Sequence, residues 1–130
     1  MDFDWLRTSC LSFPGAYEDY PFGPETAVFR VRLRHRDETP GKIFALVGMD
    51  ADPPSISLKC DPGLAVQLRA AHPEITGAWH LNKKHWNGVR LDGDVLAGTV
   101  LDLIEDSYDL IVASLPAADR RALGWSPLGP

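Results

Sequence analysis

The densest group of chemically versatile side chains lies in WHLNKKHWNGVRL, residues 79–91. Indole rings stack on unpaired bases, and lysines contact phosphates. The alternative is structural: Trp79 and Trp86 pack against a sheet, while Lys83 and Lys84 are solvated at a turn. We expect Trp86 to pack inward and anchor the turn, because burying an indole is favourable and burying an unpaired ammonium group is not. Lys83 and Lys84 should therefore point to solvent.

His80 and His85 in the same stretch are candidate general bases or metal ligands. No cysteine or further histidine stands at metal-ligand spacing from them. The sequence also has no glycine-rich phosphate loop and no Ser-His-Asp elbow. It thus favours hydrogen-bonded structural histidines, and it predicts no metal, no cofactor and no enzymatic activity.

Arginines alternate with apolar residues in TAVFRVRLRH, residues 26–35. On a strand, three of them share the outward face: Arg30, Arg32 and Arg34. Their spacing of about 7 Å approximates that of phosphates along one nucleic-acid strand. The alternative is an outward strand kept soluble and protected from edge pairing. The nucleic-acid interpretation gains support only if this row joins Lys83, Lys84 and Arg90 in space.

Charge is distributed unevenly along a chain of net charge −5. Residues 30–90 hold ten Lys/Arg against six Asp/Glu, whereas residues 1–29 and 91–130 are both acidic. Such asymmetry favours a local positive patch on an acidic protein. We expect the acidic ends to repel DNA and to orient the long helix away from it.

The 130 residues fit one domain, placed at residues 1–124, with a short loose tail at 125–130. Cys10 and Cys60 have apolar neighbours and are interpreted as small buried hydrophobes in a reducing compartment. The acidic start MDFDWLRTSC lacks the apolar run of a signal peptide, and no stretch reaches the roughly 18 apolar residues of a membrane span. We therefore expect a cytoplasmic protein without membrane association.

Apolar periodicity divides the chain into helices and strands. Strands are predicted at residues 26–35, 42–49, 55–60 and 86–91. Helices are predicted at residues 3–13, 61–73 and 95–114, with Asp2, Asp61 and Asp94 as N-caps, and a short helical turn within 117–124. Because three strands follow one another directly, the pattern indicates an α+β fold, with a mostly antiparallel sheet and helices packed on one face.

Two finer expectations concern the long helix and the loop over residues 16–26. The inner stripe of the helix is predicted to be Leu96, Val100, Leu103, Ile104, Ser107 and Ile111. Its four carboxylates, Asp102, Glu105, Asp106 and Asp109, should lie mainly outside that stripe. The loop AYEDYPFGPET is expected to be rigid, with Asp19 accepting backbone hydrogen bonds and Tyr20 and Phe22 inserted into the core.

Three stretches, EDYPFGPE at 18–25, PPSISLKCDP at 53–62 and HLNKKHWNGVRLDG at 80–93, resemble the MmcQ/YjbR family in their order and spacing. The resemblance covers nearly the whole chain. It implies a YjbR-like α+β fold, similar to the secretion-chaperone-like or frataxin-like arrangement, with a likeness to double-wing DNA-binding architectures. Members are commonly named DNA-binding proteins. The family motifs also imply that five residues meet at one site: Asp19, Lys59, His80, Asn82 and Trp86.

Two classes of function follow, both for a monomer or weak dimer. The first is weak, largely nonspecific DNA binding through a basic sheet face and the 83–90 segment. Its expected contact residues are Arg30, Arg32, Arg34, Lys83, Lys84, His85 and Arg90. The alternative is a non-enzymatic protein- or peptide-interaction module. Contiguous cations on the surface favour the first class, and an exposed apolar patch favours the second.

Overall fold

The computed structural model describes residues 1–32, 40–49, 54–78, 81–92 and 95–125. Their strands form one six-stranded sheet in the order β1-β2-β3-β4-β6-β5, and every neighbouring pair is antiparallel. The strands are β1 Ala16–Asp19, β2 Thr26–Val31, β3 Lys42–Gly48, β4 Ser55–Lys59, β5 Ile75–Gly77 and β6 Trp86–Arg90. The α+β class with an antiparallel sheet is therefore confirmed.

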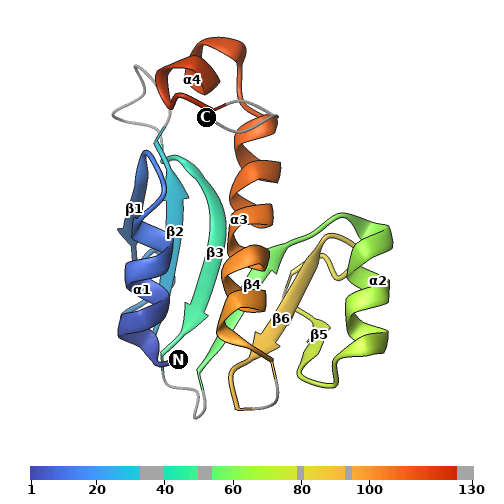
Figure 1. Ribbon diagram of the computed structural model, residues 1–130. Helices are drawn as coiled ribbons and strands as arrows, with labels where there is room; N and C mark the ends of the chain where they lie inside the picture. Colours follow the sequence, from blue (N-terminus) through green and yellow to red (C-terminus); the bar gives the residue numbers. More distant parts are fainter. Residues whose placement is uncertain (33–39, 50–53, 79–80, 93–94, 126–130) are drawn as a thin grey trace.

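The helices pack along this sheet in separate places (Figure 1). They are α1 Phe3–Leu11, α2 Pro62–Ala71, α3 Ala97–Ala113 and α4 Ala117–Ala122. The first helix contacts β1, α3 contacts β3 and β4, and α2 contacts β5 and β6. The short α4 follows α3 at one end of the sheet (Figure 1).

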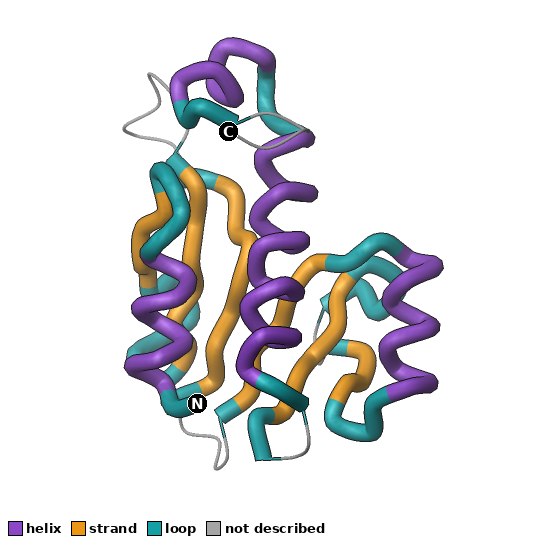
Figure 2. The backbone as a smooth tube through the Cα atoms, viewed as in Figure 1, coloured by secondary structure: helices purple, strands orange, loops and turns teal. Residues whose placement is uncertain are grey.

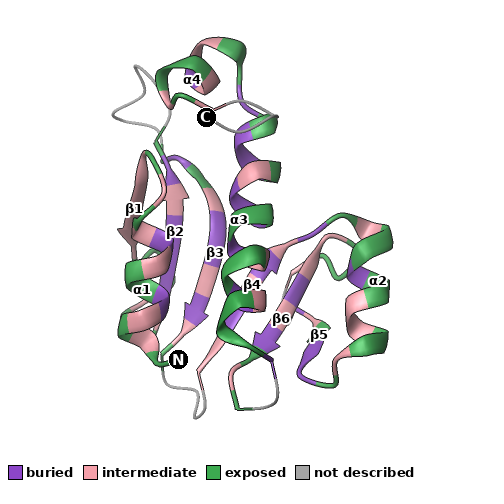
Figure 3. Cartoon of the chain, in the orientation of Figure 1, coloured by how far each residue is buried: buried purple, intermediate pink, exposed green. Residues whose placement is uncertain are grey.

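Alternation along the strands assigns each side chain to one of two faces. Phe29, Val47, Ile56 and Val89 are buried in the hydrophobic core and share one face through the strand pairings. The helices α1, α2 and α3 cover this helix-side face, as predicted. Figure 3 shows the same division on α3, whose buried stripe faces the strands. No helix among the described residues covers the opposite face, which we call the helix-free face.

The ladder between β3 and β4 opens at one end, and Ser107 of α3 bridges the opening. Ala45 pairs with Leu58, so Phe44 and Lys59 are the next residues to face each other. The Lys59 N–H donates to Ser107 Oγ at 2.9 Å, and the Ser107 hydroxyl donates to the Phe44 carbonyl at 2.6 Å. The strands β1–β3 and β4–β6 therefore lie on either side of α3 (Figure 2).

Helix starts follow the predicted caps in two cases and differ in the third. The side chains of Asp2 and Asp61 accept hydrogen bonds from the backbone of the first turns of α1 and α2. The long helix begins at Ala97, with Leu96 at the N-cap and no side-chain cap; Asp94 lies outside the described residues. Leu96 is 72% exposed, so its place in the inner stripe is wrong, and Val95 is buried instead.

The stretch predicted as a loop after the first helix contains a strand. Ala16–Asp19 form β1, which pairs with β2 at the edge of the sheet. Tyr20 is 39% exposed and Phe22 is 66% exposed, so neither side chain is inserted into the core. The turn signals hide β1, because it is only four residues long and all four are half-buried.

Both cysteines are free and buried, as predicted. Burial raises the pKa of the Cys10 thiol to about 12. Burial also raises the pKa of Cys60, and the carboxylates of Asp106 and Asp61 add to that effect. Among the described residues, no helix is both long and apolar enough to cross a membrane.

Candidate functional site

Arg30 and Arg32 share the outward face of the sheet as predicted, but Arg30 is engaged by other residues. A β-bulge interrupts the β2–β3 pairing between Phe29 and Arg30. The Arg30 guanidinium donates to Asp19 Oδ2 and to the Gly41 carbonyl, both at 2.9 Å, and only 12% of its side chain is exposed. Asp19 also accepts a hydrogen bond from the backbone of Tyr20, as predicted. Arg30 is therefore occupied within the sheet and is withdrawn as a phosphate contact.

Arg32 keeps the predicted exposure, and its guanidinium carbon lies 4.5 Å from the centre of the Tyr17 ring. Two cations on strands lie on the same helix-free face, because their neighbours Leu58 and Val89 point into the core. These two are the half-buried Lys59 and the exposed Arg90. Arg34 lies outside the described residues.

A tight turn places the predicted contact residues before β6. Asn82 Oδ1 accepts from the Lys84 N–H at 3.0 Å, and the Asn82 carbonyl accepts from His85 and Trp86. The His85 carbonyl accepts from the Cys60 N–H at 2.7 Å, which ties the turn to the end of β4. Asn82 therefore shapes the turn, as asparagine commonly does. His80 and Trp79 lie outside the described residues.

Lys83 and Lys84 are both exposed, as predicted. They do not join the helix-free face as a pair. A Cβ placed on Gly77 would meet the Lys83 side chain at 2.9 Å, and Gly77 pairs with Asn87 of the helix-side face. Arg69 of α2 also donates to the Lys83 carbonyl at 2.7 Å. Lys83 therefore lies beside α2.

Trp86 is half-buried and pairs across the strands with Lys59 on the helix-free face. It begins β6 and is not among the side chains packed on the main core, so its burial is partial: Trp86 is neither mostly exposed nor inserted into that core. Of the residues that the family motifs imply, Lys59 and Trp86 do come together. Asp19 is on β1, three strands from Lys59 on β4, which is a separation of about 14 Å across the sheet. Asp19 forms an ion pair with Arg30 instead.

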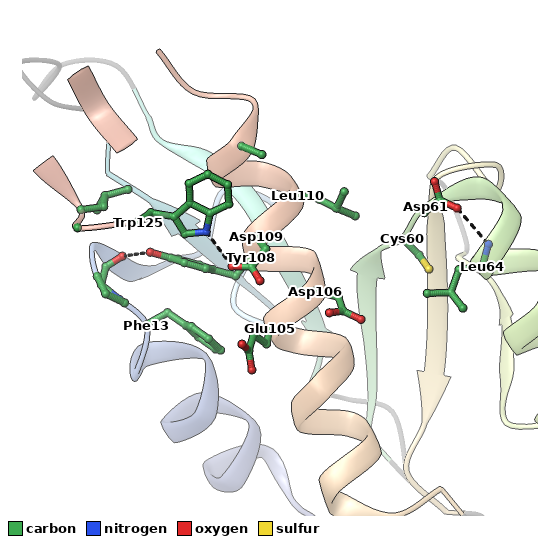
Figure 4. Close-up of a pocket in the computed structure, with 14 residues that line it drawn as sticks. Phe13, Cys60, Asp61, Leu64, Glu105, Asp106, Tyr108, Asp109, Leu110 and Trp125 are labelled. Atoms are coloured by element: carbon green, nitrogen blue, oxygen red, sulfur yellow. Dashed lines mark hydrogen bonds between the residues drawn. The ribbon is translucent and has the colours of Figure 1, made fainter. Parts of the chain in front are cut away.

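An apolar groove of about 890 Å³ lies along the outer side of α3 (Figure 4). We call it the α3 groove. Its lining comes from four parts of the chain: Phe13, Pro14, Cys60, Asp61, Leu64, Glu105, Asp106, Tyr108, Asp109, Leu110, Ala113, Leu123, Gly124 and Trp125.

One half of the α3 groove is an aromatic wall. Phe13 and Tyr108 stack with ring centres 4.8 Å apart, and the Tyr108 hydroxyl donates to the Pro14 carbonyl. The Trp125 indole N–H donates to Asp109 Oδ1 at 2.9 Å. Trp125, expected in a loose tail, is therefore held against α3; residues 126–130 lie outside the described residues.

The other half lies between α3 and the start of α2. In Figure 4, Asp106 and Leu110 point from α3 toward Cys60 and Leu64. Leu64 and Leu110 are 38% and 37% exposed, so this half offers apolar surface to a ligand. Asp61 is used locally, because its Oδ2 accepts from the Leu64 N–H at 3.2 Å.

The charged groups lining the α3 groove are all acidic: Asp61, Glu105, Asp106 and Asp109. Desolvation raises the pKa of Asp106, and the nearby charges of Asp109 and Asp102 raise it further. Within the described part of the chain, no three His, Cys, Asp or Glu side chains are arranged to hold a metal ion.

A second, small cavity of about 10 Å³ adjoins the groove, and Cys60 and Asp106 line both. Asn87 also lines it and is only 3% exposed. Its Nδ2 donates to the Ala65 carbonyl at 3.4 Å, while its Oδ1 accepts no hydrogen bond from the residues that the structure describes. An unsatisfied buried acceptor is uncommon and requires a physical reason.

The sequence contains one signal for the α3 groove that the prediction of the inner stripe did not use. Leu110 and Ala113 share the outer surface of the helix with the carboxylates, at spacings of three and four residues. The remaining lining residues are far apart in the chain and become neighbours only in the fold.

The architecture defines a class of small α+β proteins with one antiparallel sheet and helices on one face. The family model of YjbR matches residues 11–110, and the chain belongs to the YjbR family. The predicted resemblance is thus confirmed for the family.

Relatives and solved structures agree with this assignment. YjbR of Escherichia coli K12 is 38% identical over 123 residues, covering 95% of this chain and 98% of that protein. The crystal structure of Deinococcus radiodurans protein DR2400, a DUF419 domain, has a TM-score of 0.86 at 38% identity and covers 96% of this chain and 89% of that one. A crystal structure from Pseudomonas syringae has a TM-score of 0.68 at 32% identity and covers 85% and 99%.

Proposed function

We propose that this chain is a non-enzymatic interaction module that binds a peptide segment of a partner protein across α3. The observation that carries the proposal is the α3 groove, with its volume of about 890 Å³ and its partly exposed leucines. Exposed apolar surface of this kind marks interaction sites on folded proteins.

The shape of the groove favours a peptide over a compact ligand. The helix α3 divides the hollow, with the aromatic wall on one side and Leu64 on the other (Figure 4). A compact ligand fills one half, whereas a helical segment laid over α3 contacts both. The helix-in-groove mode of recognition uses this arrangement of apolar anchors.

The test uses three labelled model peptides of about 18 residues, five helical turns. Each has leucine on one face, and the other face carries lysine, glutamine or glutamate. Fluorescence anisotropy measures binding, and NMR chemical-shift changes locate the site. We expect saturable binding of at least one peptide, with changes centred on residues 105–113 and 60–64.

A pair of matched variants separates the groove from general hydrophobic contact. Leu110→Gln removes an apolar anchor that lines the groove, and Leu101→Gln alters a leucine of similar exposure, 42% against 37%, that does not line it. Losing one buried leucine costs about 1.5–3 kcal/mol, so L110Q should weaken binding roughly tenfold or more. The proposal fails if no peptide binds, or if both variants weaken binding equally.

DNA binding is the second candidate, supported by three cations on the helix-free face: Arg32 directly after β2, Lys59 on β4 and Arg90 on β6. The resemblance to double-wing and frataxin-like architectures supports this candidate by analogy of fold alone. The set of contacts is smaller than the sequence predicts, since Arg30 is paired and Lys83 lies beside α2. For both candidates, we propose that the protein acts in the cytoplasm as a monomer or weak dimer.

A further inference from the structure

We infer that the partner segment is a basic amphipathic helix, whose cations lie over the Asp106 end of the α3 groove. The inference rests on the proposed function and adds the chemistry of the partner. Three observations support it: the charges of the lining, the surroundings of Asp106 and the unpaired oxygen of Asn87.

The lining residues carry four carboxylates and no lysine or arginine among the described residues. Leu64, Leu110 and Trp125 provide apolar contact between these carboxylates. A helix with leucine-like side chains on one face and cations flanking them is complementary to both features. An acidic helix would bring like charges together, which is strongly unfavourable at an interface.

Asp106 lies where a cation is most needed. Asp102 and Asp109 are one helical turn away on the same helix, and both raise its pKa. No ion pair with Asp106 occurs within the described part of the chain. An ammonium or guanidinium group bound beside Asp106 would attract this carboxylate and offset its repulsion by Asp102 and Asp109.

Asn87 supplies an independent observation at the same end. Its Oδ1 is an acceptor without a partner among the described residues, and it lines the cavity that Cys60 and Asp106 share with the groove. The Asp106 carboxylate and the unpaired Asn87 Oδ1 are both acceptors, and Lys59 is the cation that lines the same cavity. A group with several N–H donors, such as lysine or arginine, is able to donate to such acceptors.

The experiment compares the lysine, glutamine and glutamate peptides on the full chain. We expect the lysine peptide to bind at least tenfold more tightly than the glutamine peptide, and the glutamate peptide to bind most weakly. If the glutamine or glutamate peptide binds as tightly as the lysine peptide, the inference is wrong while the interaction module stands. If no peptide binds, both proposals fail.

Matched charge reversals exclude general attraction to an acidic protein. Glu105→Lys with Asp106→Lys should remove the preference for the lysine peptide. Asp4→Lys with Glu25→Lys makes the same change in net charge at exposed residues outside the groove and should largely retain the preference. An equal loss in both pairs overturns the inference. Circular dichroism checks folding, and the milder pair Glu105→Gln with Asp106→Asn should give an intermediate result.

Discussion

The hydroxyl of Ser107 is both donor and acceptor at the point where β3 and β4 separate. It accepts from the backbone of Lys59 and donates to the backbone of Phe44, and Ser107 itself is fully buried. A hydroxyl is one of the few groups that can satisfy a facing N–H and C=O at once. The serine on an otherwise apolar helical stripe thus joins α3 to both halves of the sheet.

Replacing Ser107 by alanine should destabilise the protein by about 3 kcal/mol, because two buried backbone groups then lose their partner at about 1–3 kcal/mol each. Urea unfolding followed by circular dichroism measures the change. Ser12→Ala is the control, since Ser12 is exposed at the end of α1 and surface changes usually stay within about 0.5 kcal/mol. Equal effects of the two substitutions would contradict the bridging role.

Arg30 shows why single residues were hard to assign from the sequence. Its period-2 position predicts an outward side chain, and it does lie on the helix-free face. Its partner Asp19 is brought there by β1, which is an edge strand that the turn-rich sequence conceals. The Gly41 carbonyl accepts the other hydrogen bond of Arg30. Only glycine fits at position 41, because a Cβ there would lie 1.9 Å from the Val31 carbonyl oxygen. Alternation gives the face of a side chain but not its partner.

At the scale of elements, the longer strands and helices were predictable because each carries its own periodic pattern and cap. The strands β2, β3, β4 and β6 lie within the predicted ranges. The strands β1 and β5 have four and three residues, too few to establish an alternation. The long helix was predicted to start at residue 95, two residues before its observed start at Ala97. Val95 is buried before the helix begins, whereas Leu96, predicted to be on the inner stripe, is exposed.

The acidic outer stripe of α3 is expected to reduce the stability of the free protein. Asp106 lies four residues after Asp102 and three before Asp109, and like charges at these spacings each cost about 0.2–0.5 kcal/mol. The carboxylates at 106 and 109 also lie in the second half of the helix, where its dipole disfavours negative charge. A residue that costs stability in the free chain is consistent with a role in binding.

Asp106→Asn should therefore stabilise the free protein at neutral pH by about 0.5–1 kcal/mol, since two unfavourable pairs disappear. The advantage should shrink as the pH falls. The raised pKa of Asp106 means that the folded protein takes up a proton at higher pH than the unfolded chain, so acidification relieves the same repulsion in the wild type. Urea unfolding at neutral and acidic pH checks both the sign and the trend. A destabilised variant at neutral pH would contradict the like-charge argument.

The whole molecule has two different faces. The helix side carries the acidic α3 groove, and the helix-free side carries Lys59 and Arg90 on its strands and Arg32 directly after β2. The charge asymmetry of the sequence predicts such a division in general terms. Its residues could not be predicted, because the groove joins Phe13, Leu64 and Trp125, which are neighbours only in the folded chain.

If the helix-free face binds DNA, its three cations, Arg32, Lys59 and Arg90, set the salt dependence. Each neutralised phosphate adds about −0.9 to the slope of log K against log salt for duplex DNA, so three contacts give about −2.7. Binding to mixed-sequence duplex should be measurable at low salt and almost absent at physiological salt.

The double substitution Arg32→Glu with Lys59→Glu should abolish this binding. Lys42→Glu with Arg121→Glu is the matched control, because Lys42 reaches Ser114 after α3 and Arg121 is exposed on α4. Anisotropy titrations at two salt concentrations test this candidate: absent binding at low salt, or equal losses in both double variants, would contradict DNA binding by the helix-free face.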